Sequence, residues 1–239
     1  VRGTTLLSGN SSVSGTLEVN NDFTVTSGPS KLIDTSISSN KIVFGGLIAD
    51  ATTNAPYEVF YDKAIISATN SNIYSVASVI VGGSGHTISG DFDVIAGGAT
   101  NNISGGNFNF IGGGTGIDIK QSAWTSSLGG QNNDVESASQ SVIGGGINNS
   151  IKNTESAALL GGISNTITGN GWGFIGGGEN NTVTGSHGSV LGGENNGAYG
   201  YQSSVAGGGS NEAHGRYSFV GGGQYNLTSG NNSFCLGRQ

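Results

Sequence analysis

The clearest pattern in the chain is a pair of apolar residues followed by two or three glycines, which recurs along its last two thirds. At residues 141–146 it reads S-V-I-G-G-G. The first glycines of successive copies are Gly82, Gly97, Gly112, Gly129, Gly144, Gly161, Gly176, Gly192, Gly207 and Gly221, with a partial copy ending on Gly237. The intervals between them run from 14 to 17 residues, centred on about 15. That is the length of one small coil of a β-solenoid.

The residue directly before the glycines is aliphatic in every copy, and the residue before that is apolar except at Ser127. The aliphatic column is Val81, Ala96, Ile111, Leu128, Ile143, Leu160, Ile175, Leu191, Ala206, Val220 and Leu236. Neighbouring side chains of a strand point to opposite faces, so two adjacent apolar residues predict a strand covered on both sides. Because one coil has a single interior, we expect other copies of the chain to cover the second face. The pattern therefore predicts a homo-oligomer of about three chains.

Two further columns complete the coil. The second apolar position is filled by Ile88, Ile103, Val135, Ile151, Ile167, Val183, Ala198, Ala213 and Leu227. Each coil is therefore expected to contain two very short strands joined by two turns. Asn recurs four residues after the first glycine, as Asn101, Asn133, Asn148, Asn165, Asn180, Asn196 and Asn211. Asn tolerates left-handed backbone and its amides can bond along a stack, so this column predicts a structural turn rather than a ligand site.

The chain divides near residue 76, because forty of its 46 glycines lie in 77–239. Residues 1–30 contain two stretches of alternating apolar and polar residues, at 16–20 and 22–26, and are predicted to form a β-structured stalk. Residues 31–76 are predicted to be a transition or capping region, and 77–239 the Gly-rich β-roll. The 17-residue intervals 112–129 and 144–161 are expected to bulge outward as loops. Since the chain ends within a repeat, we expect it to be a fragment or a processed product.

Composition narrows the possible partners. The formal net charge is −7, which argues against nucleic acid binding through a basic surface. No apolar run approaches the ~18 residues of a membrane-spanning helix, so we expect no membrane insertion by this part of the protein. The single cysteine, Cys235, occupies an apolar position of the last repeat and is expected to be a small buried residue.

The sequence contains no convincing catalytic or cofactor site. None of the glycine runs is followed by Lys-Ser or Lys-Thr, so a phosphate-binding loop is not expected. His86, His187 and His214 lack the spacing of metal ligands and are expected at the surface or in turns. Asp91 and Asp93 could place two carboxylates on one strand face, the minimum for a glycosidase, but short coils leave little room for a groove. We therefore expect no catalytic residue, no metal and no cofactor.

Aromatic residues interrupt the small and polar turns and are the candidate ligand-binding residues. They are Trp124, Trp172, Tyr199, Tyr201, Tyr217 and Tyr225. Tyrosine and tryptophan supply rigid contact area with a polar handle, as binding surfaces require. Packing at seams between chains explains each of them equally well, and the sequence leaves both interpretations open.

The copy at 204–215, S-V-A-G-G-G-S-N-E-A-H-G, resembles the repeats of the left-handed parallel β-roll heads of YadA-type trimeric autotransporter adhesins. Similar repeats occur in the fibres of phages and other viruses. The resemblance covers about 77–239 and implies a left-handed, homotrimeric roll that binds a host surface. The region 1–30 looks more like the shaft of a virion fibre.

Together these observations predict an all-β parallel β-solenoid with about 15-residue coils. The predicted function is that of a non-catalytic virion (tail) fibre or adhesin, located on the virion or the extracellular surface. Its expected partners are two further copies of itself and a host glycan or protein receptor, bound by avidity. The alternatives are the head of a bacterial trimeric autotransporter adhesin and a purely structural fibre spacer.

Overall fold

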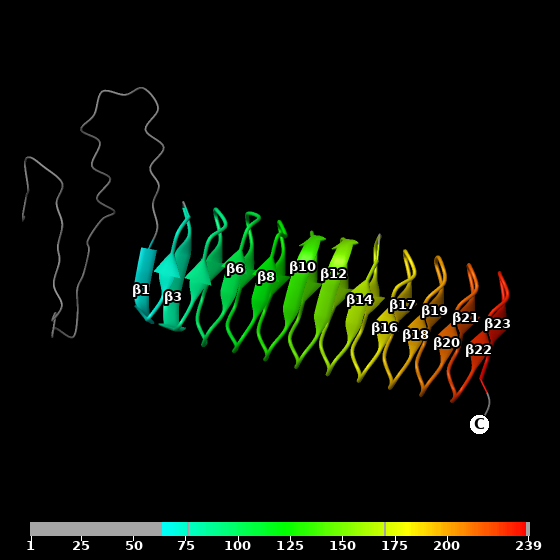
Figure 1. Cartoon of the computed structure of the whole chain (residues 1–239). Coiled ribbons are helices and arrows are strands. Elements are labelled where there is room, and N and C mark those ends of the chain that lie inside the picture. The colour runs from blue at the N-terminus through cyan, green and yellow to red at the C-terminus, as the bar shows by residue number, and fades with distance from the viewer. Residues whose placement is uncertain (1–63, 76, 170, 238–239) are drawn as a thin grey trace, which may run out of the picture. The chain divides into compact units, whose positions relative to one another are not determined.

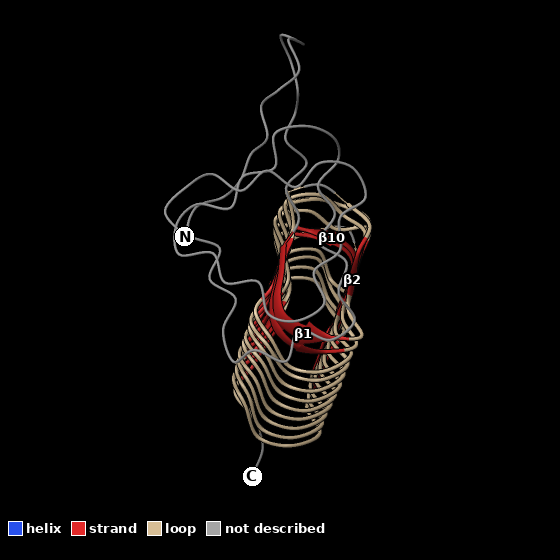
Figure 2. Ribbon diagram, turned by 90° about the vertical axis from the view of Figure 1, so that its left-hand side faces the viewer, coloured by secondary structure: helices blue, strands red, loops and turns tan. Residues whose placement is uncertain are grey.

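The computed structural model describes residues 64–237 except residues 76 and 170. Over these residues the chain forms 23 strands and no helix, wound into a stack of coils (Figures 1 and 2). Every strand pairs in parallel with the equivalent strand of the neighbouring coil. The parallel β-solenoid predicted from the repeat is confirmed.

The strands form two sheets, one from each side of the coil. The odd sheet has twelve strands: β1 (Ala64–Thr69), β3 (Val79–Ser84), β5 (Val94–Ile95), β7 (Phe110–Ile111), β9 (Ser126–Ser127), β11 (Val142–Ile143), β13 (Ala158–Leu159), β15 (Phe174–Ile175), β17 (Ser189–Val190), β19 (Ser204–Val205), β21 (Phe219–Val220) and β23 (Phe234–Cys235). The even sheet has eleven: β2 (Asn72–Ile73), β4 (Thr87–Ile88), β6 (Asn102–Ser104), β8 (Asp118–Lys120), β10 (Asp134–Ser139), β12 (Ser150–Glu155), β14 (Thr166–Thr168), β16 (Thr182–Val183), β18 (Gly197–Ala198), β20 (Glu212–Ala213) and β22 (Leu227–Thr228).

Both sheets begin before residue 77, because β1 pairs with β3 and β2 pairs with β4. The proposed stalk at 1–30 lies outside the described residues, and so does most of the proposed capping region at 31–76. These two assignments stay predictions.

The interior of each coil is filled mainly by one apolar side chain from each strand. The odd sheet contributes Ile80, Ile95, Ile111, Ile143, Leu159, Ile175, Val190, Val205 and Val220, all fully buried. The even sheet contributes Ile88, Ile103, Ile119, Val135, Ile151, Ile167, Val183, Ala198 and Ala213. Removing these side chains from water is the main favourable term for such a thin fold. At the last strand the column ends with Cys235, which is half-buried rather than buried as expected.

The repeat is anchored by a single glycine per coil, and this glycine is not the first of its group. Ten glycines have φ between 85° and 94°: Gly83, Gly98, Gly114, Gly130, Gly146, Gly162, Gly178, Gly193, Gly208 and Gly223. A Cβ on Gly162 would meet the carbonyl oxygen of Gly178 in the next coil, and the same holds along the column up to Gly208. Only glycine fits this conformation and this approach.

The anchoring glycines are spaced by 15 or 16 residues, so the predicted 17-residue loops at 112–129 and 144–161 are wrong. The apparent irregularity arises because the first glycine of a triple occupies the place of an outward apolar residue. Strand pairing of Ile143 with Leu159 places Gly144 opposite Leu160. The first glycines of these two copies, Gly144 and Gly161, are therefore not equivalent positions, and an alignment on them is shifted by one residue.

Buried asparagines join successive coils through a ladder of hydrogen bonds. Asn165 N donates to Asn149 Oδ1 at 3.0 Å, and Asn165 Oδ1 accepts from Asn181 N at 2.9 Å. The Nδ2 of Asn165 donates to the carbonyls of Gly161 at 3.1 Å and Gly178 at 2.9 Å. The amide is thus satisfied inside the turn, as a buried polar group must be.

The predicted asparagine column needs two corrections. The ladder uses Asn149 and Asn181, whereas Asn148 and Asn180 lie one residue earlier, where the backbone is left-handed at φ 55° and 53°. His86 takes the ladder position in its own coil, so it lies in a turn as expected, but it is fully buried and not at the surface. Its Nδ1 accepts from Asn101 N at 3.2 Å, which reproduces the role of an asparagine oxygen.

Candidate functional site

The odd sheet presents apolar side chains outward as well as inward. The residues on either side of each buried one form the apolar face: Val79, Val81, Val94, Phe110, Leu128, Val142, Leu160, Phe174, Leu191, Phe219, Phe234 and Leu236. The side chains of Leu128, Leu160 and Leu191 are 55–58% exposed. The strip is interrupted at β17 and β19, where Ser189 Oγ donates to Ser204 Oγ at 2.9 Å. Its length still places it at the large end of the apolar patches found on monomers.

Bulk alternates from side to side along the apolar face. A large residue before the buried position goes with glycine after it, as in Phe110 with Gly112 and Phe174 with Gly176. In β9, β13 and β17, a small residue comes first and leucine second, as in Ser126 with Leu128. The alternation stops at β19, which carries Ser204 and Ala206. From β7 to β17 the bulky side chains form a zigzag ridge that can interdigitate with a similar surface. The glycines beside them are sterically closed, because a Cβ on Gly112 or Gly176 would meet the carbonyl oxygen of a leucine in the next coil.

The outward face of the even sheet, the polar face, carries small polar and charged residues instead. Lys152 contacts Asp134 at 2.6 Å and Glu136 at 3.3 Å, and Lys120 contacts Asp118 at 2.6 Å. Hydrogen bonds to Asp118 and Asp134 raise the pKa of Lys120 and Lys152 respectively. These ion pairs are solvent-exposed and already partnered within the chain, which suits a hydrated surface.

Between the even and odd strands of each coil lies a corner that varies in length. The buried Gly188 is five positions after the buried Val183, whereas Ala157 is six positions after Ile151. The extra residue of the 16-residue coils is therefore accommodated at this corner. The opposite corner, with the anchoring glycine and the asparagine, keeps a constant length.

The variable corner collects aromatic side chains along the stack and is called here the aromatic corner. Its aromatic members are Phe92, Phe108, Trp124, Trp172, His187, Tyr201 and Tyr217. Phe92 stacks on Phe108 with centroids 5.0 Å apart, and Phe108 stacks on Trp124 at 5.9 Å with an interplanar angle of 2°. Trp124 and Trp172 are each 61% exposed.

Several of these bulky residues adopt a backbone conformation that disfavours them. Phe92, Phe108, Trp124, His187 and Tyr217 have φ between 53° and 61°, in the left-handed region. The constant corner meets the same demand almost entirely with Gly, Asn, Ser and Thr. The left-handed backbone is energetically unfavourable for such bulky residues, and their side chains are mostly exposed. Their presence here therefore indicates a role at the surface.

A second aromatic group lies farther along the same corner. Trp172, His187, Tyr201 and Tyr217 form a continuous series with centroids 5.4–5.6 Å apart. The guanidinium of Arg216 lies 5.3 Å from the ring centroid of Tyr201 and 5.6 Å from that of Tyr217. Such cation–π contacts hold exposed rings in a defined orientation.

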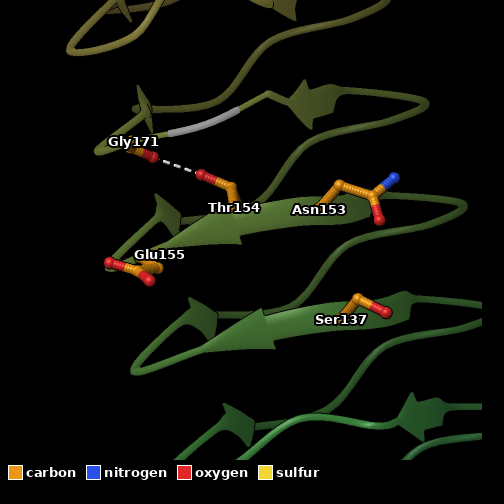
Figure 3. Close-up of a pocket in the computed structure, with 5 residues that line it drawn as sticks. All are labelled: Ser137, Asn153, Thr154, Glu155 and Gly171. Atoms are coloured by element: carbon orange, nitrogen blue, oxygen red, sulfur yellow. Dashed lines mark hydrogen bonds between the residues drawn. The ribbon is translucent and has the colours of Figure 1, made fainter.

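A shallow polar recess of about 560 Å³ opens at this corner between the two aromatic groups (Figure 3). It is lined by Ser137, Asn153, Thr154, Glu155 and Gly171. Thr154 Oγ1 donates to the carbonyl of Gly171, while the side chains of Asn153 and Glu155 are exposed. The recess thus offers amide, hydroxyl and carboxylate groups at the surface of the rod.

The structure brings together four of the six predicted ligand-binding residues. Trp124, Trp172, Tyr201 and Tyr217 all lie on the aromatic corner. Tyr199 instead belongs to the polar face, where it packs on His214 with centroids 4.7 Å apart and burial raises its pKa. Tyr225 lies on the constant corner and is 82% exposed.

The sequence analysis did not select Phe92, Phe108, His187 or Arg216 as site residues. A signal was present, because Phe92, Phe108 and Trp124 are 16 residues apart and Trp172 follows 48 residues later. These separations equal one coil and three coils of the same length. Reading aromatics at the period of the coil would have found the corner.

The candidate carboxylates do not form an open pair. Asp93 is fully buried, with Oδ1 accepting from Asn109 N at 2.7 Å, whereas Asp91 is half-buried at the aromatic corner. Within the described part of the chain, no cluster of three or more potential metal ligands occurs. Over the same residues, no helix has the length and apolar character to cross a membrane.

No protein-family model and no curated protein sequence matches this chain.

Proposed function

We propose that this chain is a non-catalytic structural and attachment protein, a virion (tail) fibre or an adhesin. It assembles as a homotrimer through the apolar face. It is located on the virion or the extracellular surface and attaches there to a host cell. The observation that carries the proposal is the contrast between a zigzag apolar face on one sheet and a charged, hydrated face on the other.

The size of the apolar face supports an association between copies. Twelve strands at about 4.8 Å per layer make a strip roughly 55 Å long. At a width of about 10 Å, the strip covers roughly 550 Å², which is at the upper limit for apolar patches on monomers and about two-thirds of the ~800 Å² that one partner contributes to a typical interface. Three copies around an axis would bury all three strips at once, with the bulky side chains of one strip packed between those of a neighbour.

Attachment follows from the aromatic corner, which the same geometry repeats on every copy. A stiff trimer presents three such corners, so weak individual contacts add up to strong binding. The head of a bacterial trimeric autotransporter adhesin would use the same two surfaces. A purely structural spacer would need only the apolar face.

The proposal is tested by the mass of the chain in solution, measured by sedimentation equilibrium or light scattering across a concentration series. We expect a particle near three times 23.8 kDa at micromolar concentration. A well-folded monomer that persists at the highest concentration would overturn the assembly, because the apolar face would then lie open to water.

A further inference from the structure

The aromatic corner contains a gap that is bounded by the only two tryptophans of the chain. Trp124 and Trp172 occupy the same corner position three coils apart, which at about 4.8 Å per coil is a separation of roughly 14 Å. The two coils between them carry Gln140 and Ser156 at this position. These four residues define what we call the tryptophan slot.

The open ring face of Trp124 borders the slot. One face of Trp124 is covered by Phe108 of the preceding coil in a parallel stack, so its other face is directed toward the coil of Gln140. Trp172 is held on its far side by His187, with centroids 5.4 Å apart. The slot is therefore bordered by two tryptophan side chains that their outer neighbours keep in place.

The floor and side of the slot are polar. Ser156 Oγ donates to Gln140 Oε1 at 3.1 Å, which orients the Gln140 amide. The recess with Asn153 and Glu155 opens beside Ser156 and is lined by Gly171 of the next coil, where Ser186 occupies the place that a side chain of Gly171 would take (Figure 3). Amide and carboxylate groups here make no hydrogen bond to the described residues other than this one, so they remain available to a ligand.

We infer that the tryptophan slot and the adjoining recess bind a short neutral oligosaccharide, an inference that rests on the proposed attachment function. Sugar rings present apolar C–H faces that stack on indole and hydroxyl rims that bond to amides and carboxylates. The chain has a net charge of −7 and Glu155 lies in the recess, so an anionic ligand would be repelled. Between one tryptophan and the other there is length for two or three sugar units.

The experiment uses the intact assembled protein and an array of neutral and acidic oligosaccharides, followed by fluorescence titration with the best neutral hit. Because all tryptophan emission arises from the two residues that border the slot, binding is expected to shift the emission directly. Acrylamide should also quench both tryptophans in the trimer. Absence of any neutral hit, or tryptophans shielded at a seam between chains, overturns the inference.

Variants locate the site. Trp124→Ala, Trp172→Ala and the pair Asn153→Ala/Glu155→Ala should each weaken binding by about tenfold or more. Tyr74→Ala, at an exposed aromatic residue outside the candidate site, serves as the matched control. Unchanged affinity in the tryptophan variants would place the sugar elsewhere and reject the slot. Binding of a protein receptor that no sugar inhibits would also reject it.

The sugar site and the assembly can fail independently. A trimer that binds no neutral sugar rejects the site and leaves the assembly intact. A monomer in the mass measurement rejects the proposed assembly whether or not sugars bind.

Discussion

The two outward faces of the solenoid are built on the same backbone and differ in almost every side chain. From β2 to β22, each strand of both sheets places an apolar residue inward, except β9 and β22, where Ser127 and Thr228 are buried instead. At β22 the expected inward residue, Leu227, faces outward and is 61% exposed. Outside, the odd sheet repeats leucine, valine and phenylalanine, whereas the even sheet carries threonine, serine and paired charges. The interior explains why the chain folds into coils. Only the difference between the outward faces indicates which face binds other molecules.

The largest effect is expected from placing charge on the apolar face. The double variant Leu160→Glu/Leu191→Glu should weaken association by about a thousandfold or more, because two desolvated carboxylates would face each neighbouring chain. Both leucines are mostly exposed in the single chain, so circular dichroism should stay unchanged while the mass falls to that of a monomer.

The matched control carries the same charges on the polar face. Thr168→Glu/Thr184→Glu alters two outward positions of β14 and the coil that follows it, and should leave the mass unchanged. Loss of assembly in both double variants, or in neither, would show that the two faces are equivalent and would remove the basis of the proposed trimer.

At the junction of the two faces, adjacent glycines should respond very differently to alanine. Gly162→Ala should reduce the free energy of unfolding by roughly 3 kcal/mol or more, since φ is 93° and a Cβ would meet the carbonyl of Gly178. Gly161→Ala meets open space at an ordinary φ and should change stability by less than about 1 kcal/mol. Chemical denaturation measures both, and equal losses would disprove the assigned register.

The carboxyl group of Asp93 is buried, whereas the carboxylates of Asp118 and Asp134 on the polar face are paired with lysines near the surface. Burial raises the pKa of Asp93 from 3.8 to about 6, and among the described residues its Oδ2 has no hydrogen-bond partner. The folded chain therefore holds this proton more tightly than the unfolded chain. Stability from this group is greatest below about pH 4, declines as pH rises toward 6 and is then constant, with a total loss of roughly 3 kcal/mol.

Asp93→Asn should remove this pH dependence and raise stability at neutral pH. The equivalent residue of the next coil is already an asparagine, Asn109, whose Nδ2 donates to the carbonyl of Ser122 at 2.9 Å. Thermal unfolding from pH 4 to 8 measures the effect. An unchanged pH profile in the variant would mean that Asp93 is ionised in the fold without cost.

The smallest effect is expected on the polar face itself. Lys152→Ala removes the ion pairs to Asp134 and Glu136 and should cost less than about 1 kcal/mol, because exposed pairs are screened and held at the expense of side-chain entropy. The loss should shrink further at high salt. A large loss, or any change in mass, would show that this face is part of an interface.

The doubled apolar positions are visible in any alignment of the repeat and were read correctly as a solenoid. The residue directly before the glycines is nevertheless inward in some copies, as Ile143 is, and outward in others, as Leu160 is. The frame of that alignment was harder to read. Glycine occurs both as the anchoring residue of the turn and at the outward position next to a bulky residue such as Phe110. The sequence alone does not distinguish these two roles. Even the last glycine of a group misleads at 207–209, where the anchoring residue with φ near 90° is Gly208.

The candidate site shows the same division. Trp124, Trp172, Tyr201 and Tyr217 were identified individually because aromatic residues stand out among small polar ones. Their common corner was not assigned, because the frame counted from the first glycine drifts by one residue between copies. The 16-residue spacing of Phe92, Phe108 and Trp124 does carry that information. Tyr199 and Tyr225 have the same composition signal but lie on other surfaces.

The sequence by itself determined the all-β class, the parallel coils, the two short strands of each coil and the doubled apolar positions, because each depends only on the period of the side chains. The tertiary structure decided which glycine is sterically required, which asparagine is buried and which residues share a corner. These features depend on contacts between coils, where a carbonyl or an amide one layer away limits what a position can hold. The sequence of a single strand does not show which group of the next coil lies against it.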